Sequence, residues 1–252
     1  LAAAMLNCLL RDRCSDGVIF PMVVCSIPAT EFAAGIAETV KSVIGGEYEI
    51  TSVDGDRTLY VVIKPENLII IPEGAGSYFY GLKLTEGLGT QEVAILDTGF
   101  YTTDLVIFNR KGYVPGSAHS CRYGVRSVAE AVQRYLRRTE DYHGDLWAVD
   151  SALDVGMIAL GNRCVEFGAA RDEAYRELLA NLEVFYRSNK GNRTPGIVLL
   201  SGGGAIGLYK QLPQKLIDSG WRVVSGDPRR ANVDGGLLFL KERQQRKANG
   251  SE

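Results

Sequence analysis

Two aspartates stand at the inner ends of two apolar runs in the segment ILDTGFYTTDLVIF, residues 95–108. Asp97 ends the first run and Asp104 begins the second, with glycine and threonine between them. Turn N–H groups and threonine hydroxyls can point at a phosphate, and glycine lets the backbone approach it closely. Two carboxylates aimed at one phosphate would repel it, so a metal is implied, and Asp97 could hold Mg²⁺ through water. The segment therefore predicts a phosphate-gripping hairpin, although the same residues also suit an ordinary polar turn.

A second glycine-rich segment, SGGGAIG, follows the apolar run GIVLL. Three consecutive glycines indicate that the backbone must come close to another group. The segment also satisfies the pattern GxGxxG, at Gly202, Gly204 and Gly207. Asp227 lies 20 residues after Gly207, which on paper matches a dinucleotide-binding fingerprint. Only 25 residues remain after Asp227, and Pro213 falls where the crossover helix should be continuous, so the pattern argues against that fold.

Two weaker segments complete the polar pattern. Glu73, in IPEGAG at residues 71–76, follows an apolar run and precedes a predicted helix. A glutamate there is often only a favourable first-turn charge, but it could orient an attacking water for phosphoryl transfer. RRANVDGG, at residues 229–236, has small residues that could simply let the following helix pack closely. The sequence contains no GxxxxGK[ST], which excludes a Walker-type NTPase at the level of motifs.

The composition is that of a globular protein with a substantial core. The chain has 252 residues, of which 46% are hydrophobic and 23% charged, and its net charge of -2 offers no basic field for direct binding of nucleic acid. Five cysteines without CxxC spacing and only two histidines argue against disulfides, structural zinc and a histidine triad. No apolar run reaches the roughly 18 residues of a membrane helix. We expect a cytoplasmic protein without membrane attachment.

Strand and helix patterns alternate along the chain, which predicts an α/β protein with mixed sheets. Strands are expected at 20–28, 67–74, 95–108 (as a pair), 196–200 and 221–225, and a hairpin at 48–53 and 58–63. Helices are expected at 1–12, 29–45 (with Thr30 as N-cap), 75–84, 123–138, 172–188, after Pro213, and within 227–245. The region 139–171 reads as irregular, with short apolar pieces.

Taken in this order, the segments resemble the actin-like ATPase superfamily, and most closely the plasmid-segregating actins of the ParM/StbA type. ILDTGFYTTD resembles the second phosphate hairpin, VLLSGGGAIG the adenosine segment, RRANVDGG the closing segment, and IIPEGAGSYFY the connecting helix with its catalytic glutamate. The resemblance spans nearly the whole chain. It implies an actin-like (ribonuclease H-like) fold, in which mixed sheets with flanking helices form two domains around a nucleotide cleft.

The resemblance also implies a domain organisation. Residues 1–90 would be the remainder of the first domain and end in the connecting helix. Residues 91–228 would form the second domain, with a small insertion around 139–171, and residues 229–252 a terminal helix that returns to the first domain. The family's first phosphate hairpin is not found upstream of Glu73. Because the sequence begins with Leu1, we expect a fragment that lacks its first strands and that, without this hairpin, could be inactive alone. A natural variant with an impaired site is the alternative.

Roles for individual residues follow from the resemblance by position. Glu73 would position the lytic water, and Asp97 would be catalytic through a water-linked Mg²⁺. The helix at 172–188 would approach the base. The nucleotide, ATP or ADP, would contact Asp97, Thr98, Gly99, Phe100, Tyr101, Thr102, Thr103, Gly202, Gly203, Gly204 and Ala205.

The resemblance implies an ATPase that forms filaments with itself, for plasmid or DNA segregation, together with a DNA-bound adaptor protein. One alternative is a sugar or acetate kinase of the same superfamily, although we find no convincing second aspartate to serve as its base. A NAD-binding Rossmann protein is a lesser alternative. A membrane-tethered scaffold is disfavoured because the tail KERQQRKANGSE is too polar for a membrane helix.

Overall fold

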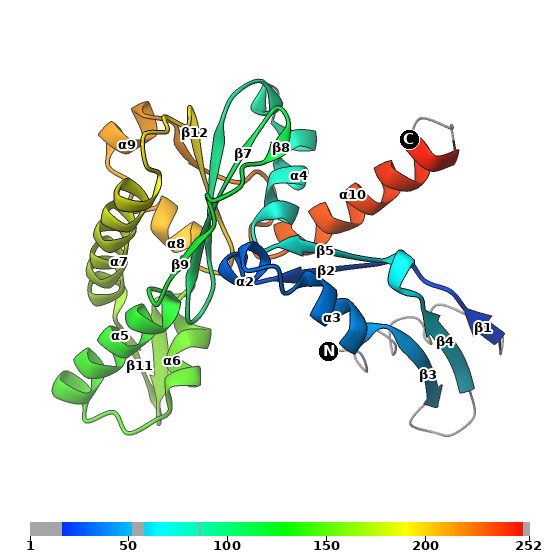
Figure 1. The fold of residues 1–252 in the computed structure, drawn as a ribbon. Coiled ribbons are helices and arrows are strands. Elements are labelled where there is room, and N and C mark those ends of the chain that lie inside the picture. Colours follow the sequence, from blue (N-terminus) through cyan, green and yellow to red (C-terminus); the bar gives the residue numbers. More distant parts are fainter. Residues whose placement is uncertain (1–16, 52–57, 86, 249–252) are drawn as a thin grey trace.

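The computed structural model describes residues 17–51, 58–85 and 87–248, and the helix expected at 1–12 lies outside them. The chain forms two groups of elements (Figure 1). A six-stranded sheet with helices α5 to α9 lies on one side, and strands β1 to β5 with α2 and α3 lie on the other. None of the described helices combines the length and the apolar composition that crossing a bilayer requires.

The six-stranded sheet is built around strand β12 (Ile197–Ser201). It pairs in parallel with β13 (Trp221–Val223) and with β6 (Val93–Thr98). Strand β7 (Thr103–Asn109) runs antiparallel to β6 and also pairs with β8 (Gly112–Tyr113) and β9 (His119–Cys121). The strand pair expected at 95–108 is therefore confirmed, and the sheet is mixed, as expected.

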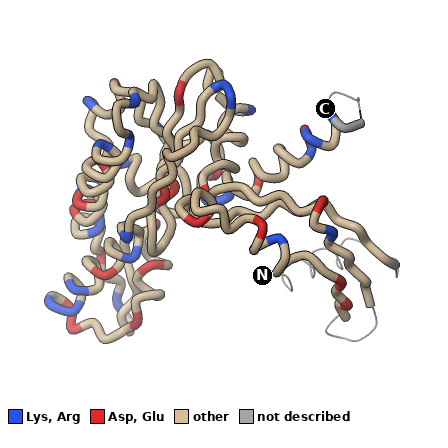
Figure 2. Tube along the Cα trace, viewed as in Figure 1, with Lys and Arg blue, Asp and Glu red and all other residues tan. Residues whose placement is uncertain are grey.

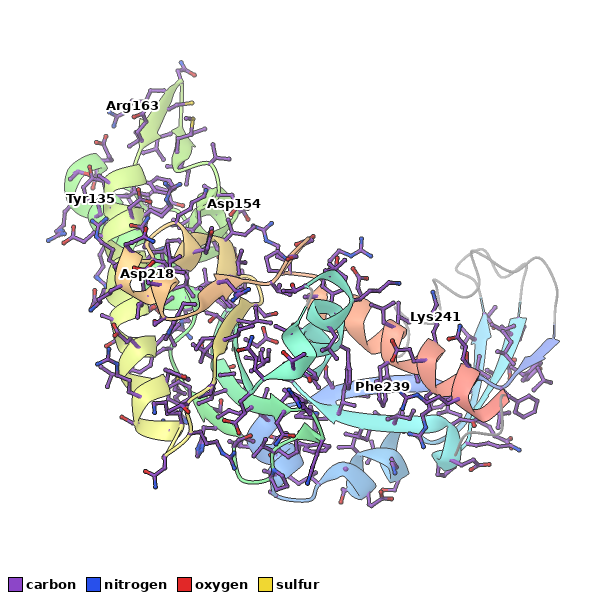
Figure 3. The ribbon with its side chains drawn as sticks, turned by 90° about the horizontal axis from the view of Figure 1, so that it is seen from above. Tyr135, Asp154, Arg163, Asp218, Phe239 and Lys241 are labelled. Carbon is purple, nitrogen blue, oxygen red and sulfur yellow. The ribbon has the colours of Figure 1, made fainter. Side chains whose placement is uncertain are left out.

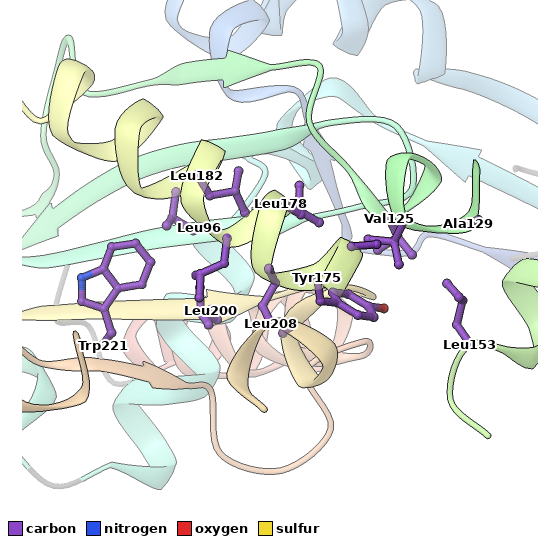
Figure 4. Close-up of a cluster of buried hydrophobic side chains, with 14 of the residues drawn as sticks. Leu96, Val125, Ala129, Leu153, Tyr175, Leu178, Leu182, Leu200, Leu208 and Trp221 are labelled. Atoms are coloured by element: carbon purple, nitrogen blue, oxygen red, sulfur yellow. The ribbon is translucent and has the colours of Figure 1, made fainter. Parts of the chain in front are cut away.

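Both faces of this sheet are covered, which explains why its central strands are almost continuously apolar. On one face, Leu96 and Leu200 pack with Leu178 and Leu182 of α7 (Gly168–Asn189) (Figure 4). This face also carries the amphipathic α5 (Val125–Glu140), α8 (Ala205–Tyr209) and α9 (Gln214–Asp218). The helix expected after Pro213 is confirmed, because Pro213 is the N-cap of α9.

The region 139–171 is more regular than its sequence suggested. It contains α6 (Leu146–Ala152), the antiparallel pair β10 (Met157–Leu160) and β11 (Arg163–Glu166), and the first turn of α7. The expectation of an irregular segment was wrong because these elements are too short to show a clear period. Helix α6 depends on a local cap, in which Ala148 N donates to the Asp145 carboxylate at 2.7 Å.

The other face of the large sheet packs on α4 (Ala75–Leu84) and α10 (Ala231–Ala248). These two helices cross at glycines: a Cβ on Gly235 would lie 1.7 Å from Gly76 O. Any side chain at this crossing would push the helices apart. The close packing that small residues in 229–236 suggested is therefore confirmed.

The remaining strands form two small sheets. Strands β1 (Gly17–Ile19), β4 (Thr58–Ile63) and β3 (Gly46–Thr51) make one, and β2 (Val23–Ile27) pairs in parallel with β5 (Leu68–Pro72) in the other. The antiparallel pairing of β3 with β4 confirms the expected hairpin, whose turn at 52–57 is outside the described residues. A short 3₁₀ turn, η1 (Pro65–Asn67), precedes β5, and a second one, η2 (Leu88–Thr90), precedes β6.

The single helix expected at 29–45 was wrong. The structure has two helices, α2 (Ala29–Ala33) and α3 (Ala37–Ile44). Gly35 separates them with φ of 81°, a left-handed conformation that interrupts an α-helix. Thr30 is also not the N-cap, because it lies inside α2 and Pro28 holds that position.

Candidate functional site

Three carboxylates meet where β5 and β6 end. Asp97, near the end of β6, lies directly opposite Asp104 on β7 in the antiparallel register, so both side chains project from the same face. Glu73 follows β5, and its backbone N–H donates to Ile27 O at 2.8 Å, which extends the pairing of β2 with β5. Asp104 in turn accepts a hydrogen bond from Ala29 N at 3.3 Å. The structure thus brings together three acidic residues from separate strands.

Burial and mutual repulsion hold these carboxylates closer to neutrality than usual. Burial, together with the nearby charges of Asp104 and Asp97, raises the pKa of Glu73 to about 7. Burial raises the pKa of Asp97 to about 6, against a hydrogen bond from Asn232 that lowers it. Burial also raises the pKa of Asp104. Such perturbation by desolvation and like charge is typical of functional sites.

The donor set of this cluster fits a water-linked magnesium ion. None of the described Lys or Arg side chains forms an ion pair with the three carboxylates. Within the described ranges, no three acidic, histidine or cysteine side chains are arranged to ligate a metal directly. Mg²⁺ binds few carboxylates and keeps most of its waters, so the carboxylates of Glu73, Asp97 and Asp104 could hold it through water.

The turn between β6 and β7 holds the adjacent helix in place. Gly99 N donates to Thr102 O at 2.9 Å and closes the turn. Gly99 O and Phe100 O accept from Val125 N and Arg126 N, the first N–H groups of α5, at 3.0 and 2.8 Å. The N–H groups of Phe100 and Tyr101 have no partner within the described part of the chain. The turn is therefore rigid and presents unpaired donors, as an anion-binding turn requires.

The threonines of this hairpin divide into two kinds. Thr98 and Thr103 are fully buried; the Thr103 hydroxyl donates to Tyr123 O at 2.7 Å, and its oxygen lies 3.2 Å from Thr98 Oγ1. Their hydroxyls therefore help to hold the hairpin together, and the expected phosphate-lining role of Thr103 stays a prediction. Thr102 is only partly buried. Tyr101 is exposed at the tip, with the Arg126 guanidinium 5.6 Å from its ring centre.

The glycine loop after β12 lies against the aspartate hairpin. Ser201 pairs with Asp97 in the parallel register, and Gly204 N donates to Thr98 O at 3.0 Å. Gly202 has φ of 82°, and a Cβ there would lie 2.4 Å from Asp97 Oδ1. Gly203, in contrast, faces open space. Ala205 is fully buried in the core, so of the four predicted residues Gly203 is the one whose added Cβ would meet open space, and contact of all four with the nucleotide stays a prediction.

Asn232, the second residue of α10, connects these segments. Its Nδ2 donates to Asp97 Oδ2. Its Oδ1 accepts from Gly74 N at 3.2 Å and from Ser77 N at 3.1 Å, at the start of α4. The Ser77 hydroxyl in turn bonds to the Ser201 hydroxyl. The Asn232 amide therefore ties α10 to Asp97, to the segment that carries Glu73 and, through Ser77, to Ser201 at the end of β12.

A cavity of about 280 Å³ opens beside Gly203. Its apolar wall includes Phe100 and Tyr175, and Tyr175 lies on the helix expected to approach the base. Trp147 stacks on Phe100 with ring centres 4.8 Å apart. Asp154, labelled in Figure 3, forms an ion pair with Arg229 at the edge of the same cavity. The cavity is slightly smaller than the roughly 300–1,000 Å³ usual for small-molecule sites, and its walls combine aromatic and charged side chains.

Sequence reasoning missed several residues of this site. Tyr175 and Asp154 had no local signal, since an aromatic residue on an amphipathic helix usually indicates core. Asn232 stood in a segment that was noticed only for its small residues. Its position three residues before Gly235 was the available signal, because a helix that packs this closely brings its polar residues to the neighbouring backbone.

Comparison with known proteins gives the class of fold. Residues 95–214 match the family model described as archaeal actin homologue MreB-like, C-terminal. No curated protein matches the sequence significantly. The chain has the actin-like fold, as expected, and this excludes the Rossmann alternative.

Three solved structures illustrate the similarity. A 15-stranded ParM filament from Clostridium botulinum is 19% identical with a TM-score of 0.74, over 95% of this chain and 72% of that chain. The archaeal actin homologue Ta0583 in complex with ADP is 18% identical with a TM-score of 0.72, over 95% and 77%. Bacillus thuringiensis ParM with ATP is 13% identical with a TM-score of 0.72, over 96% and 72%. The expected resemblance to ParM-type actins is thus confirmed at the level of the fold.

Proposed function

We propose that this protein binds and hydrolyses ATP and that it assembles into filaments. The observation that carries the proposal is the meeting of Glu73, Asp97 and Asp104 beside a glycine loop and a turn with unpaired N–H groups. A phosphate chain needs donors along its oxygens and a cation between it and any carboxylate. The hairpin turn and Gly203 supply the approach for the phosphates, and the carboxylates supply the cation site.

Asp97 and Glu73 have different tasks in this proposal. Asp97 would hold Mg²⁺ through its waters, and the bound ion would supply positive charge that neutralises the phosphates. Asn232 fixes the orientation of the Asp97 carboxylate. Glu73 orients the attacking water and accepts its proton. A carboxylate with a pKa raised to about 7 is a suitable base near neutral pH.

The nucleoside occupies the cavity of about 280 Å³ beside Gly203. Phe100 and Tyr175 offer apolar and aromatic surface to the base, and Asp150 and Asp154 offer acceptors to ribose or base N–H and O–H groups. The cavity is next to the hairpin turn, so one ligand can span both. Structures of related fold that hold ADP and ATP support the binding of a nucleotide.

We also propose a cytoplasmic role in plasmid or DNA segregation, with the chain as filament subunit and a DNA-bound adaptor as partner. The similarity to a ParM filament supports the assembly step. The domains would be residues 1–90, 91–228 and the returning helix 229–252. The packing of α10 on α4 supports the return of the last segment.

Release of inorganic phosphate from ATP tests the catalytic assignment, with protein expressed from its complete coding sequence. Glu73→Gln and Asp97→Ala should each lower kcat by ~10²-fold or more, since each removes a group that acts on the reacting atoms. Glu66→Ala is the control, because this glutamate is exposed and has no assigned part in the site. Full activity in both site variants would refute the assigned roles. Phosphate transfer to sugars or acetate in place of water would instead support the kinase alternative.

Pelleting with ATP and with ADP tests assembly. Filaments that form with ATP and disassemble as phosphate is released would support the proposal. A protein that hydrolyses ATP but stays in the supernatant at all concentrations would contradict the filament role and leave the catalytic assignment intact.

A further inference from the structure

A groove of about 500 Å³ runs between α5 and α7 on the outer surface, away from the carboxylate cluster. Its floor consists of small or flat side chains: Ala131 and Tyr135 from α5, and Ala170 and Ala174 from α7. Tyr135 is labelled in Figure 3. Because alanine side chains are short, another element can approach the two helices closely there.

The two walls of the groove carry opposite charge. Arg134, Arg137 and Arg138 stand on the α5 wall, and Glu173 and Glu177 stand on the α7 wall. Figure 2 shows basic positions gathered over α5 at the lower left of the view. All five side chains belong to exposed residues.

These charges are not used within the chain. Among the described residues, none of the five forms an ion pair, although other arginines of the same region do. Arg126 pairs with Glu130 on α5, and Arg163 with Glu140. The groove therefore presents one positive and one negative edge, both open to a partner.

We infer that this groove is a contact surface for a second copy of the chain, related by a two-fold axis that runs along the groove. Rotation by half a turn about that axis places the α5 wall of one copy over the α7 wall of the other. Each arginine edge then faces a glutamate edge, twice in the same interface. A two-fold axis across the groove would instead set arginines over arginines. Charge complementarity thus selects both the partner and the symmetry.

The contact is side to side and does not involve the nucleotide cavity. Pairing of exposed charges is individually weak and is screened by salt, so the association should be weak and salt-sensitive. Two strands of a filament, each with many copies, would multiply such a contact. The inference extends the proposed assembly, but it does not depend on nucleotide hydrolysis.

Charge reversal tests the inference. One variant carries Arg134→Glu, Arg137→Glu and Arg138→Glu, and the other carries Glu173→Arg and Glu177→Arg. In sedimentation velocity at 0.05 M salt without nucleotide, the wild-type chain should show reversible dimers. These dimers should dissociate in 0.5 M salt, where the Debye length is roughly a third of its value at 0.05 M. Each variant alone should be monomeric, because both of its walls now carry the same sign.

The mixture of the two variants is the decisive measurement. An equimolar mixture should restore the dimer, since every wall again meets its opposite. Circular dichroism and phosphate release that match the wild type show that each variant is folded. Failure of the mixture to associate, a wild-type chain that stays monomeric at high concentration, or dimers that survive both reversals would each overturn the inference. None of these outcomes bears on ATP hydrolysis, so the two proposals fail separately.

Discussion

Replacement of Asn232 by alanine should weaken both the fold and the site, because one amide serves three partners. In Asn232→Ala, the Asp97 carboxylate loses its donor, and Gly74 N and Ser77 N lose their acceptor. Ser77 lies in the first turn of α4, where N–H groups have no partner within the helix. Gly74, at the N-cap position, has no side chain to cap this helix, so Asn232 supplies the cap from α10.

The magnitude follows from the bonds that are lost. A lost cap costs roughly 1 kcal/mol, and a hydrogen bond to a charged group roughly 1.5–3 kcal/mol. Alanine recovers roughly 0.5 kcal/mol through its higher helix propensity. We therefore expect the free energy of unfolding to fall by about 2–4 kcal/mol, with part of the loss offset where water enters the site.

Denaturant unfolding followed by circular dichroism measures this change. Asn189→Ala is the matched control, because that asparagine makes one bond, from Nδ2 to Phe185 O at 2.7 Å, and should cost about 1 kcal/mol or less. Asn232→Ala should also raise the Mg²⁺ concentration needed for half-maximal phosphate release, whereas Asn189→Ala should not. If Asn232→Ala unfolds within ~0.5 kcal/mol of the wild type and keeps its Mg²⁺ dependence, the network does not hold Asp97 and the reasoning fails.

Three further predictions concern the same site. Gly202→Ala should destabilise the chain and abolish nucleotide binding, because its Cβ would lie 2.4 Å from Asp97 Oδ1 and Gly202 has φ of 82°. Gly203→Ala is the control and should fold normally, because its Cβ would meet open space. Thermal unfolding and binding of a fluorescent nucleotide measure the two variants. Because the folded-state pKa of Glu73 is raised to about 7, the stability that this side chain contributes is present at low pH and is lost as pH rises through 7. Glu73→Gln should therefore raise the free energy of unfolding at pH 8 by on the order of 1 kcal/mol, seen as a higher Tm, and should barely change it at pH 5. An equal Tm difference at both pH values would contradict this. Trp147, stacked on Phe100 at the cavity, should change its fluorescence when ATP binds, and Trp147→Phe should remove that change while the signal of the buried Trp221 remains.

The strongest sequence signals were those that depend on neighbours along the chain. The apolar runs on both sides of Asp97 and Asp104 predicted two buried strands joined by a turn, and the register that sets these carboxylates opposite each other follows from that hairpin alone. Local reasoning failed where a single residue changed the backbone. Gly35 divides a segment with good helical periodicity, because its left-handed conformation is set by the turn between α2 and α3 and not by the apolar pattern.

The sequence by itself determined the alternation of strands and helices, the glycine loop after β12 and the aspartate hairpin, since hydrophobic period and turn chemistry are local properties. Only the tertiary structure decided which polar groups serve the site. It buried the hydroxyls of Thr98 and Thr103 between strand and helix, and it carried Asn232 across the molecule to Asp97. The contact of Asn232 with Asp97 joins residues 135 positions apart, and it depends on the glycine crossing of α4 and α10, whose geometry no local pattern encodes.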